Sequence, residues 1–242
     1  MQKEKGLKSR LVASVLALLI MSGSASLLSG CSDRTPETEP TQSVTAASTP
    51  YSPPKTEDIH CDPVKAYSGV FAEDGKKTEV KDVASVLVEN RSQTFLDRAI
   101  IKYKCGDKTA TFVVTGLPAG KKCRVLEVSK MQTDTKQDKK QDKKTEFVFE
   151  DCICTFKEDA LLVTDKVSVV AKDKSVEIKN TSMKTLKNIC VYYKNTDCDG
   201  TYIGGITYMI VASSLKPGDS LTKPSSNFSE SSEIVRYSFL EE

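Results

Sequence analysis

The sequence predicts a mainly β protein in which two tandem antiparallel β-sandwiches follow a signal peptide and a disordered tether. Three observations lead to this fold class. The folded part repeats itself with an offset near 90 residues, about the size of one β-sandwich domain. Its apolar segments are short, rich in β-branched residues and bounded by turn residues. After the signal, no segment of ten or more residues has the 3.6-residue period of a helix.

Residues 1–30 have the three parts of an export signal. The first ten residues carry four basic side chains against one acid, and the apolar core LVASVLALLIM follows. This core is too short for a stable membrane-spanning helix but has the length of a signal core. The small residues of SGSASLLSG then suit a peptidase.

The end of this signal, Leu28-Ser29-Gly30-Cys31, resembles the lipobox of bacterial lipoproteins. The resemblance covers residues 1–31 only. It implies that the Cys31 sulfur carries a diacylglyceryl group, that the chain is cut before Cys31, and that the new amino terminus is acylated. More than one acyl chain gives lasting attachment, so the expected location is the extracytoplasmic face of the cell membrane. The alternatives are a plain signal cut near Ala25, with Cys31 free, and an uncleaved membrane helix.

The charge of the mature chain gives no sign of nucleic-acid binding. The full chain has 35 basic and 33 acidic residues, and removal of the signal leaves 31 and 32, a net charge of about −1. No overall field then favours nucleic acid, and none is expected as a partner.

Residues 31–57 are predicted to be the lipidated cysteine and a disordered tether rich in Pro, Ser and Thr. The segment has almost no large apolar residue, so it cannot bury enough surface to offset its ordering entropy. We expect it to hold the folded part away from the membrane. The alternative for its YSPP stretch is a recognition segment.

The internal repeat is the most informative feature of the folded part. The segment SVLVENRSQTFLDRAIIKYK, which begins at Ser85, aligns with SVEIKNTSMKTLKNICVYYK, which begins at Ser175. Seven positions coincide at an offset of 90, namely Ser85/Ser175, Val86/Val176, Asn90/Asn180, Ser92/Ser182, Leu96/Leu186, Tyr103/Tyr193 and Lys104/Lys194. The corners GLPAG and SLKPG follow, and KTEFVFEDCICTF and SSEIVRYSFLEE are interpreted as equivalent closing strands.

Local patterns in each copy predict strands and the corners between them. In VEIKN the apolar residues alternate with charged ones, and in ICVYYK the alternation places Ile189, Val191 and Tyr193 on one face. The Asn-x-Ser turn is predicted to connect two strands, and the Leu-x-x-Gly corner to separate the next two. Gly204-Gly205 is interpreted as a strand bulge.

At this level the chain resembles the FxLYD-type and related immunoglobulin-like modules of bacterial lipoproteins. The second copy carries their pattern as VEIKNTSMKTLKNICVYYKNTDCDGTYIGGITY followed by LKPGDS. The first copy departs from it, because YKCGDKTATF shortens the central hairpin and LPAGKKC moves the proline. We therefore predict two immunoglobulin-like modules, residues 58–156 and 157–242. The resemblance concerns turn and core residues, and it implies an interaction or structural module of no agreed biochemical role.

A charged segment, residues 129–146, interrupts the first module. Its charges of both signs are too dense for a buried strand, which predicts a solvated loop. The alternative is a docking loop for an anionic polymer or for phospholipid headgroups, because its lysines outnumber its aspartates.

Seven cysteines remain besides Cys31, so in an exported chain at least one thiol stays free or pairs between chains. Cys152 and Cys154 lie two apart on a predicted strand, point to one face and are not expected to bond each other. A thiolate metal site is weakly indicated, since the spacing is unusual and His60 is the single histidine. The candidate disulfides are Cys190 with Cys198, and Cys105 with Cys123 or Cys154.

One further segment has the spacing of a metal loop. NTDCDG offers oxygen ligands at Asn195, Asp197 and Asp199, as at the start of a calcium loop, but Ile206 stands where the closing carboxylate belongs. A hairpin turn is the favoured interpretation.

No catalytic motif has its required context, so neither an enzyme nor a cofactor is expected. Ser213-x-x-Lys216 has the S-x-x-K spacing but falls on a predicted corner rather than on a helix. Carbohydrate platforms usually present tryptophan, and the chain has none, although Tyr51, Tyr192 and Tyr202 are substitutes.

Together these features predict a lipid-anchored binding module for an envelope polymer or another surface protein. The alternative is a structural spacer or an accessory subunit of a membrane complex.

Overall fold

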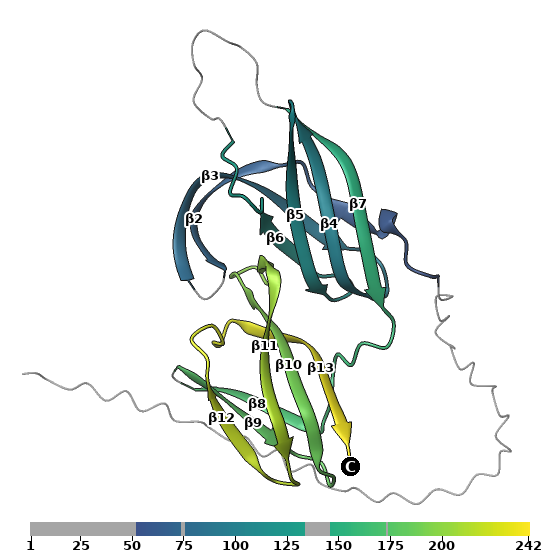
Figure 1. Ribbon diagram of the computed structural model, residues 1–242, viewed down its shortest axis with the longest axis vertical. Helices are drawn as coiled ribbons and strands as arrows, with labels where there is room; N and C mark the ends of the chain where they lie inside the picture. Colours follow the sequence, from purple (N-terminus) through teal and green to yellow (C-terminus); the bar gives the residue numbers. More distant parts are fainter. Residues whose placement is uncertain (1–51, 74–75, 134–145, 173) are drawn as a thin grey trace, which may run out of the picture. The chain divides into compact units, whose positions relative to one another are not determined.

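The computed structural model describes residues 52–73, 76–133, 146–172 and 174–242 (Figure 1). They belong to one compact unit, Thr49–Glu242. The predicted signal peptide, Cys31 and the tether up to residue 51 lie outside the described residues. The described part is mainly β, with thirteen strands and one short 3-10 helix, which confirms the predicted class.

The described structure begins within the last residues of the predicted tether. The 3-10 helix η1 (Thr56–Asp58) lies just before the first strand, where the prediction placed disordered chain. The carboxylate of Asp58 accepts from the backbone N–H of Lys55 at 2.8 Å, and its carbonyl accepts from Arg91 at 2.8 Å. The first bond caps the turn, and the second attaches it to the corner that follows β3.

The strands fall into two consecutive groups that we call the first and the second repeat. The first repeat comprises β1 (Ile59–Cys61), β2 (Lys65–Glu73), β3 (Lys76–Asn90), β4 (Phe95–Cys105), β5 (Lys108–Leu117), β6 (Lys122–Leu126) and β7 (Phe147–Lys157). The second comprises β8 (Val167–Lys172), β9 (Ser175–Asn180), β10 (Leu186–Thr196), β11 (Tyr202–Leu215), β12 (Ser220–Pro224) and β13 (Ser232–Glu241).

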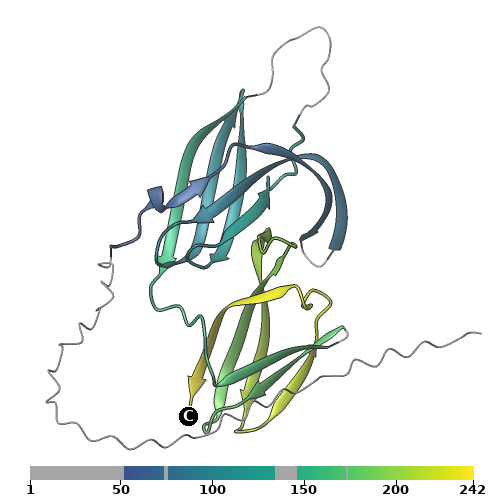
Figure 2. The same cartoon turned by 180° about the vertical axis from the view of Figure 1, so that it is seen from behind.

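The two repeats pair their strands in the same antiparallel order. The pairing β2–β3 of the first repeat corresponds to β8–β9 of the second, and β3–β6 corresponds to β9–β12. Likewise, β4–β5 corresponds to β10–β11, and β4–β7 to β10–β13. Each repeat thus has two sheets, which face each other across a core (Figures 1 and 2). In the first repeat, β1 adds to the edge of β3.

A parallel contact joins the sheets of the two repeats. Tyr202 and Ile203 at the start of β11 lie beside Cys123 and Arg124 of β6. Tyr202 is fully buried in the core of the first repeat, so it is not exposed for the carbohydrate stacking considered from the sequence. Tyr192 is partly buried, and the guanidinium of Arg236 lies 4.1 Å from its ring centre.

The predicted alternation matches the buried faces. Ile189, Val191 and Tyr193 of β10 and Val176 and Ile178 of β9 are all buried in the core of the second repeat. The corners are confirmed as well, since Asn90 and Asn180 end β3 and β9, and Leu117 and Leu215 end β5 and β11. Local turn chemistry therefore fixes the strand boundaries.

Gly204-Gly205 is the predicted bulge. Tyr193 pairs with Tyr208 and Asn195 with Ile203, so residues 204–207 of β11 stand opposite Lys194 alone. A Cβ on Gly205 would lie 1.9 Å from the carbonyl oxygen of Val113, which explains the glycine. Lys194 is fully buried, and its ammonium donates to the carbonyls of Thr115, Gly205 and Ile206 at 3.0, 3.1 and 2.8 Å.

Candidate functional site

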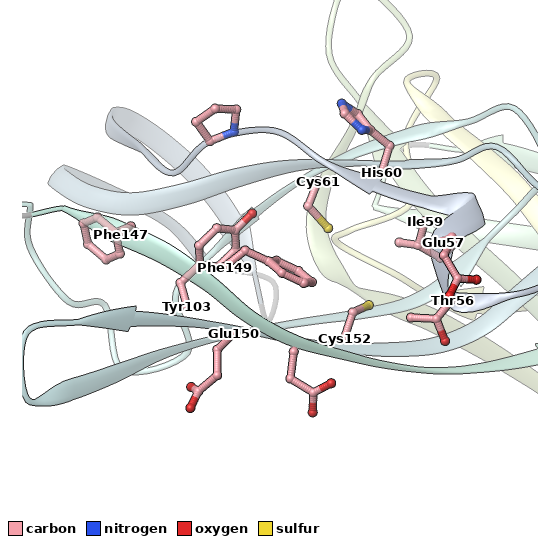
Figure 3. Close-up of a pocket in the computed structure, with 12 residues that line it drawn as sticks. Thr56, Glu57, Ile59, His60, Cys61, Tyr103, Phe147, Phe149, Glu150 and Cys152 are labelled. Carbon is pink, nitrogen blue, oxygen red and sulfur yellow. The ribbon is translucent and has the colours of Figure 1, made fainter.

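The candidate site is a cavity of about 610 Å³ at the open edge of the first repeat (Figure 3). It is lined on one side by η1 and β1, including Ile59 and Cys61, and on the other by β7, including Phe149 and Cys152. β1 ends one sheet and β7 ends the other, so two strand edges border the same cavity. We call it the edge groove.

A bulge in β7 decides which side chains enter the edge groove. Tyr103 of β4 pairs with Phe149, whereas Lys102 pairs with Asp151, so Glu150 is the extra residue. Phe149 and Cys152 consequently share the inner face of β7, although an unbroken strand would place them on opposite faces. Figure 3 shows the carboxylate of Glu150 pointing away from the groove.

Aromatic rings form the floor of the edge groove. The ring of Tyr103 packs edge-on against Phe149, with centres 5.6 Å apart, and against Phe112 at 5.8 Å. Its hydroxyl donates to the carbonyl of Asp62 at 3.1 Å. Burial raises the pKa of Tyr103 well above its usual 10.0, and the charges of Cys61 and Asp62 raise it further. The phenol therefore stays protonated and fixes the floor.

The outer edge of the groove combines apolar and acidic groups. Three apolar side chains of β7 are exposed, Val148 at 55%, Phe149 at 52% and Ile153 at 53%. Glu57, Glu150 and Asp151 are among the lining residues, which include no lysine or arginine in the described part of the chain. The groove lining is therefore apolar with acidic groups, while Lys102 and Lys104 of β4 stand opposite Asp151 and Val148.

Cys61 and Cys152 line the groove from β1 and β7, and Cys154 lies next to Cys152 on the inner face of β7. The sulfur atoms of Cys152 and Cys154 are 3.3 Å apart. Figure 3 shows the side chains of Cys61 and Cys152 pointing toward one another from β1 and β7. All three pack against the core of the first repeat. The sequence prediction that Cys152 and Cys154 face one side agrees with this arrangement, but it did not bring Cys61 to them.

The shared environment changes the acidity of the three thiols. Burial raises the pKa of Cys61 to about 12, and the charges of Cys154 and Asp62 add to the rise. The hydrogen bond from Cys152 holds the pKa of Cys154 below its usual 9.0, while the same bond, followed by burial, raises the pKa of Cys152. Cys154 is thus the first of the three to form a thiolate.

The structure does not bring the predicted disulfide partners Cys190 and Cys198 together. Cys190 lies within β10 and Cys198 beyond its end, and both thiols are free. A strand advances about 3.3 Å per residue, whereas bridged Cα atoms lie within about 7 Å. A bridge between these two would therefore need the end of β10 to unfold.

For the other predicted pairs, Cys105 and Cys123 lie in different sheets, whereas Cys154 lies in the same sheet as Cys105 but stands opposite Ala99 rather than Cys105. Cys105 ends β4, beside Lys108 and Phe147, whereas Cys123 lies in β6. The sulfur of Cys123 is buried and lies 3.0 Å from the carbonyl oxygen of Gly204, to which it donates.

The candidate calcium ligands form a turn. Both the Asp199 and the Thr201 backbone N–H groups donate to the carboxylate of Asp197, at 3.0 and 2.9 Å. The amide oxygen of Asn195 accepts from the hydroxyl of Ser232 at 2.6 Å. Within the described ranges, no group of three or more His, Cys, Asp or Glu residues is arranged to hold a metal ion.

The charged loop, residues 129–146, is described only at its ends. Residues 134–145, with most of its lysines, lie outside the described residues. Its start is fixed by the buried carboxylate of Glu127, which accepts from the backbone and hydroxyl of Ser129 at 2.8 and 2.7 Å and from the backbone of Met131 at 3.0 Å.

Comparisons with known proteins add no relative. No protein-family model matches the sequence, and no curated protein matches it. In the part of the chain that the structure describes, no helix is long and apolar enough to cross a membrane.

Proposed function

We propose that the protein is a lipid-anchored, extracytoplasmic binding module that binds a polypeptide segment of a surface protein at the edge groove, without catalysis. One observation carries this proposal. β7 is the last strand of its sheet, its exposed Phe149 lines a cavity with other aromatic rings and thiols, and Val148 and Ile153 are exposed on the same strand. The anchor is supported by the lipobox-like segment that ends at Cys31.

An extended polypeptide fits this edge better than a polysaccharide or an anionic polymer. An edge strand has N–H and C=O groups that point outward and can pair with an added strand, while alternate side chains enter pockets. Ile153 and Val148 lie on the outer face of β7, and Phe149 lies on the inner face, so both faces offer apolar contacts. Glu57 lines the groove on the η1 side, and no lysine or arginine is among the described lining residues, so a basic residue of the partner is favoured there.

Peptide selection tests the groove directly. The chain from residue 32 onward is immobilised, and peptides that bind to it are selected from a phage-displayed library of random sequences. We expect enriched peptides with alternating apolar residues and at least one Lys or Arg. Their binding should be lost in Ile153→Lys, which places a cation on the exposed strand edge, and kept in Met183→Lys, because Met183 is 93% exposed in the Asn180 corner. No enrichment, or equal binding by both variants, would reject the groove as the site.

The anchor has its own test. Cells that express the full chain are fed a fatty acid with a terminal alkyne, and the labelled protein is detected after coupling to a dye. Label on the wild type that disappears in Cys31→Ser supports acylation at this cysteine. Equal label in both, or none in either, contradicts it.

A spacer or accessory subunit is the second candidate, and the contact between the repeats favours it. Strands of the two repeats are linked by the β6–β11 pairing and by two side chains. The Lys194 ammonium and the Thr207 hydroxyl both donate to the Thr115 carbonyl, at 3.0 and 2.7 Å. Such links suit a protein that holds its ends at a fixed separation. A chain that selects no peptide and yet supports assembly of a membrane complex would favour this function.

A further inference from the structure

The three thiols of the edge groove lie on strands that the sequence places far apart. Cys61 is in β1 at the edge of one sheet, and Cys152 and Cys154 are in β7 at the edge of the other. Cys152 is 8% exposed, and the other two are partly buried. The charges of Cys154 and Cys61 act on one another strongly enough to add to the raised pKa of Cys61.

We propose that Cys61, Cys152 and Cys154 form a thiol–disulfide exchange site, in which a disulfide between Cys61 and Cys154 joins β1 to β7 and Cys152 remains a neighbouring thiol. The inference does not rest on partner binding at the groove. It differs from the disulfide pairs predicted from the sequence, in which Cys190 is paired with Cys198, and Cys105 with Cys123 or Cys154.

The geometry assigns different roles to the three thiols. The Cys152 and Cys154 sulfurs, 3.3 Å apart, share a hydrogen bond, so the loss of a proton from Cys154 leaves a thiolate that Cys152 stabilises. A disulfide between these two would have to bridge alternate residues of one strand, whose Cα atoms lie about 6.6 Å apart, near the upper limit for a bridge. Cys61 approaches the pair from the opposite sheet and avoids that constraint.

The reaction uses a low-molecular-weight disulfide, R–S–S–R, as the oxidant. The Cys154 thiolate attacks one sulfur, the S–S bond breaks, and R–S⁻ leaves with the electron pair and takes up the proton that Cys154 lost. Cys61 then gives its proton to solvent and attacks the Cys154 sulfur of the mixed disulfide, which expels a second R–S⁻ that is protonated in turn. In total, two protein thiols are oxidised to one disulfide and R–S–S–R is reduced to two R–SH.

Because β1 is a short strand of three residues, this bond has a mechanical consequence. The disulfide would tie β1 to the second sheet and close one side of the edge groove. The oxidised protein should therefore melt at a higher temperature than the reduced protein, since a bond between residues distant in sequence restricts the unfolded chain.

Peptide mapping tests the proposal. The folded chain from residue 32 onward is incubated with oxidised glutathione, quenched with N-ethylmaleimide and digested with trypsin. The sequence yields TEDIHCDPVK, which holds Cys61, and TEFVFEDCICTFK, which holds Cys152 and Cys154. We expect these two peptides joined by one disulfide, with one maleimide on the second peptide. In Cys154→Ala the joined species should form about tenfold more slowly or not at all, because the attacking thiolate is gone.

Control variants separate the site from nonspecific oxidation. Cys198→Ala removes an exposed thiol outside the cluster and should leave the joined peptides unchanged. Cys61→Ala should abolish both the joined species and the difference in melting temperature between oxidised and reduced protein. Circular dichroism shows that each variant remains folded. Recovery of Cys61 with maleimide or glutathione in the folded protein, or of Cys152 joined to Cys154, would overturn the proposal, as would unchanged joining in Cys154→Ala.

Discussion

Asn90 and Asn180, ninety positions apart in the sequence, make the same set of side-chain hydrogen bonds. The Asn90 amide group donates to the carbonyls of Thr94 and Leu117, both at 2.9 Å, and its oxygen accepts from the backbone and hydroxyl of Ser92 at 3.1 and 2.7 Å. The Asn180 amide donates to Lys184 and Leu215 at 2.8 and 2.9 Å and accepts from the backbone and hydroxyl of Ser182 at 2.9 and 2.7 Å. In each repeat this one side chain therefore connects the corner to the end of a later strand, which is β5 for Asn90 and β11 for Asn180.

The two asparagines should therefore contribute similar amounts to the free energy of unfolding. Asn90→Ala and Asn180→Ala remove a fully buried side chain together with the two hydrogen bonds that its amide group donates, which should lower the free energy of unfolding by about 2–4 kcal/mol. Urea unfolding followed by circular dichroism measures the loss. Gln93→Ala, at an exposed position of the same corner, should change it by less than about 0.5 kcal/mol. A loss in one repeat only would contradict their equivalence.

The ammonium of Lys194 is expected to stabilise the contact between the repeats. Lys194→Met keeps the apolar stem but leaves the carbonyls of Thr115, Gly205 and Ile206 without this donor, so the free energy of unfolding should fall by about 2–3 kcal/mol. Lys187→Met, on the same strand but half-exposed beside Glu242, should change it by less than about 1 kcal/mol. Equal effects in the two variants would show that the ammonium contributes nothing specific.

The close approach at Gly205 gives a steric prediction. In Gly205→Ala the new methyl group would overlap the backbone carbonyl oxygen of Val113. Neither atom can move without a shift of its own backbone. Relief requires β11 to move away from β5, so we expect a lower melting temperature and faster amide exchange in both strands. Ser213→Ala, on an exposed position of β11, provides the comparison. Unchanged exchange in Gly205→Ala would show that the two strands are not in contact.

Glu127 gives a pH dependence with a defined sign. Burial opposes ionisation of its carboxyl, but hydrogen bonds from Met131, Ser129 and Thr111 outweigh burial and hold the pKa below its usual 4.5. The folded state therefore favours the carboxylate, and the resulting stability is present above pH 4.5 and is lost as the pH falls through the lowered pKa. Unfolding of Glu127→Gln, measured from pH 7 to pH 3, should show a flatter acid limb than the wild type.

The matched control is Glu230→Gln, which changes an exposed carboxyl in the second repeat. It should follow the wild-type curve. A Glu127→Gln curve parallel to the wild type throughout would mean that the carboxylate has no preference for the folded state.

The sequence allowed strand positions and corners to be predicted because their determinants are local. Asn90, Asn180 and the Leu-x-x-Gly corners act over a few residues, and the alternation in β9 and β10 reports their buried faces. The offset of ninety then suggested that the same pairings occur twice, and the strand order of the two repeats agrees with it.

The edge groove and its thiols were not predictable in the same way. Cys61 meets Cys152 and Cys154 only because β1 joins the edge of β3 while β7 closes the opposite sheet, and no local pattern records which edges face each other. Phe149 enters the groove through a bulge at Glu150, which a strict alternation misplaces. Tyr202 joins the core of the first repeat through a parallel pairing with β6, which no turn specifies.

The central claim is that β7 of the first repeat is the surface that binds a polypeptide partner. The most direct measurement places a photoreactive benzophenone side chain at Ile153 in the full chain, with the same group at Met183 as the control, in cells that produce the protein. After irradiation, we predict that position 153 is joined to a defined polypeptide through a segment with apolar and basic residues, and that position 183 is not. Cross-links from 153 to lipid or glycan alone, or equal products from both positions, would contradict the account.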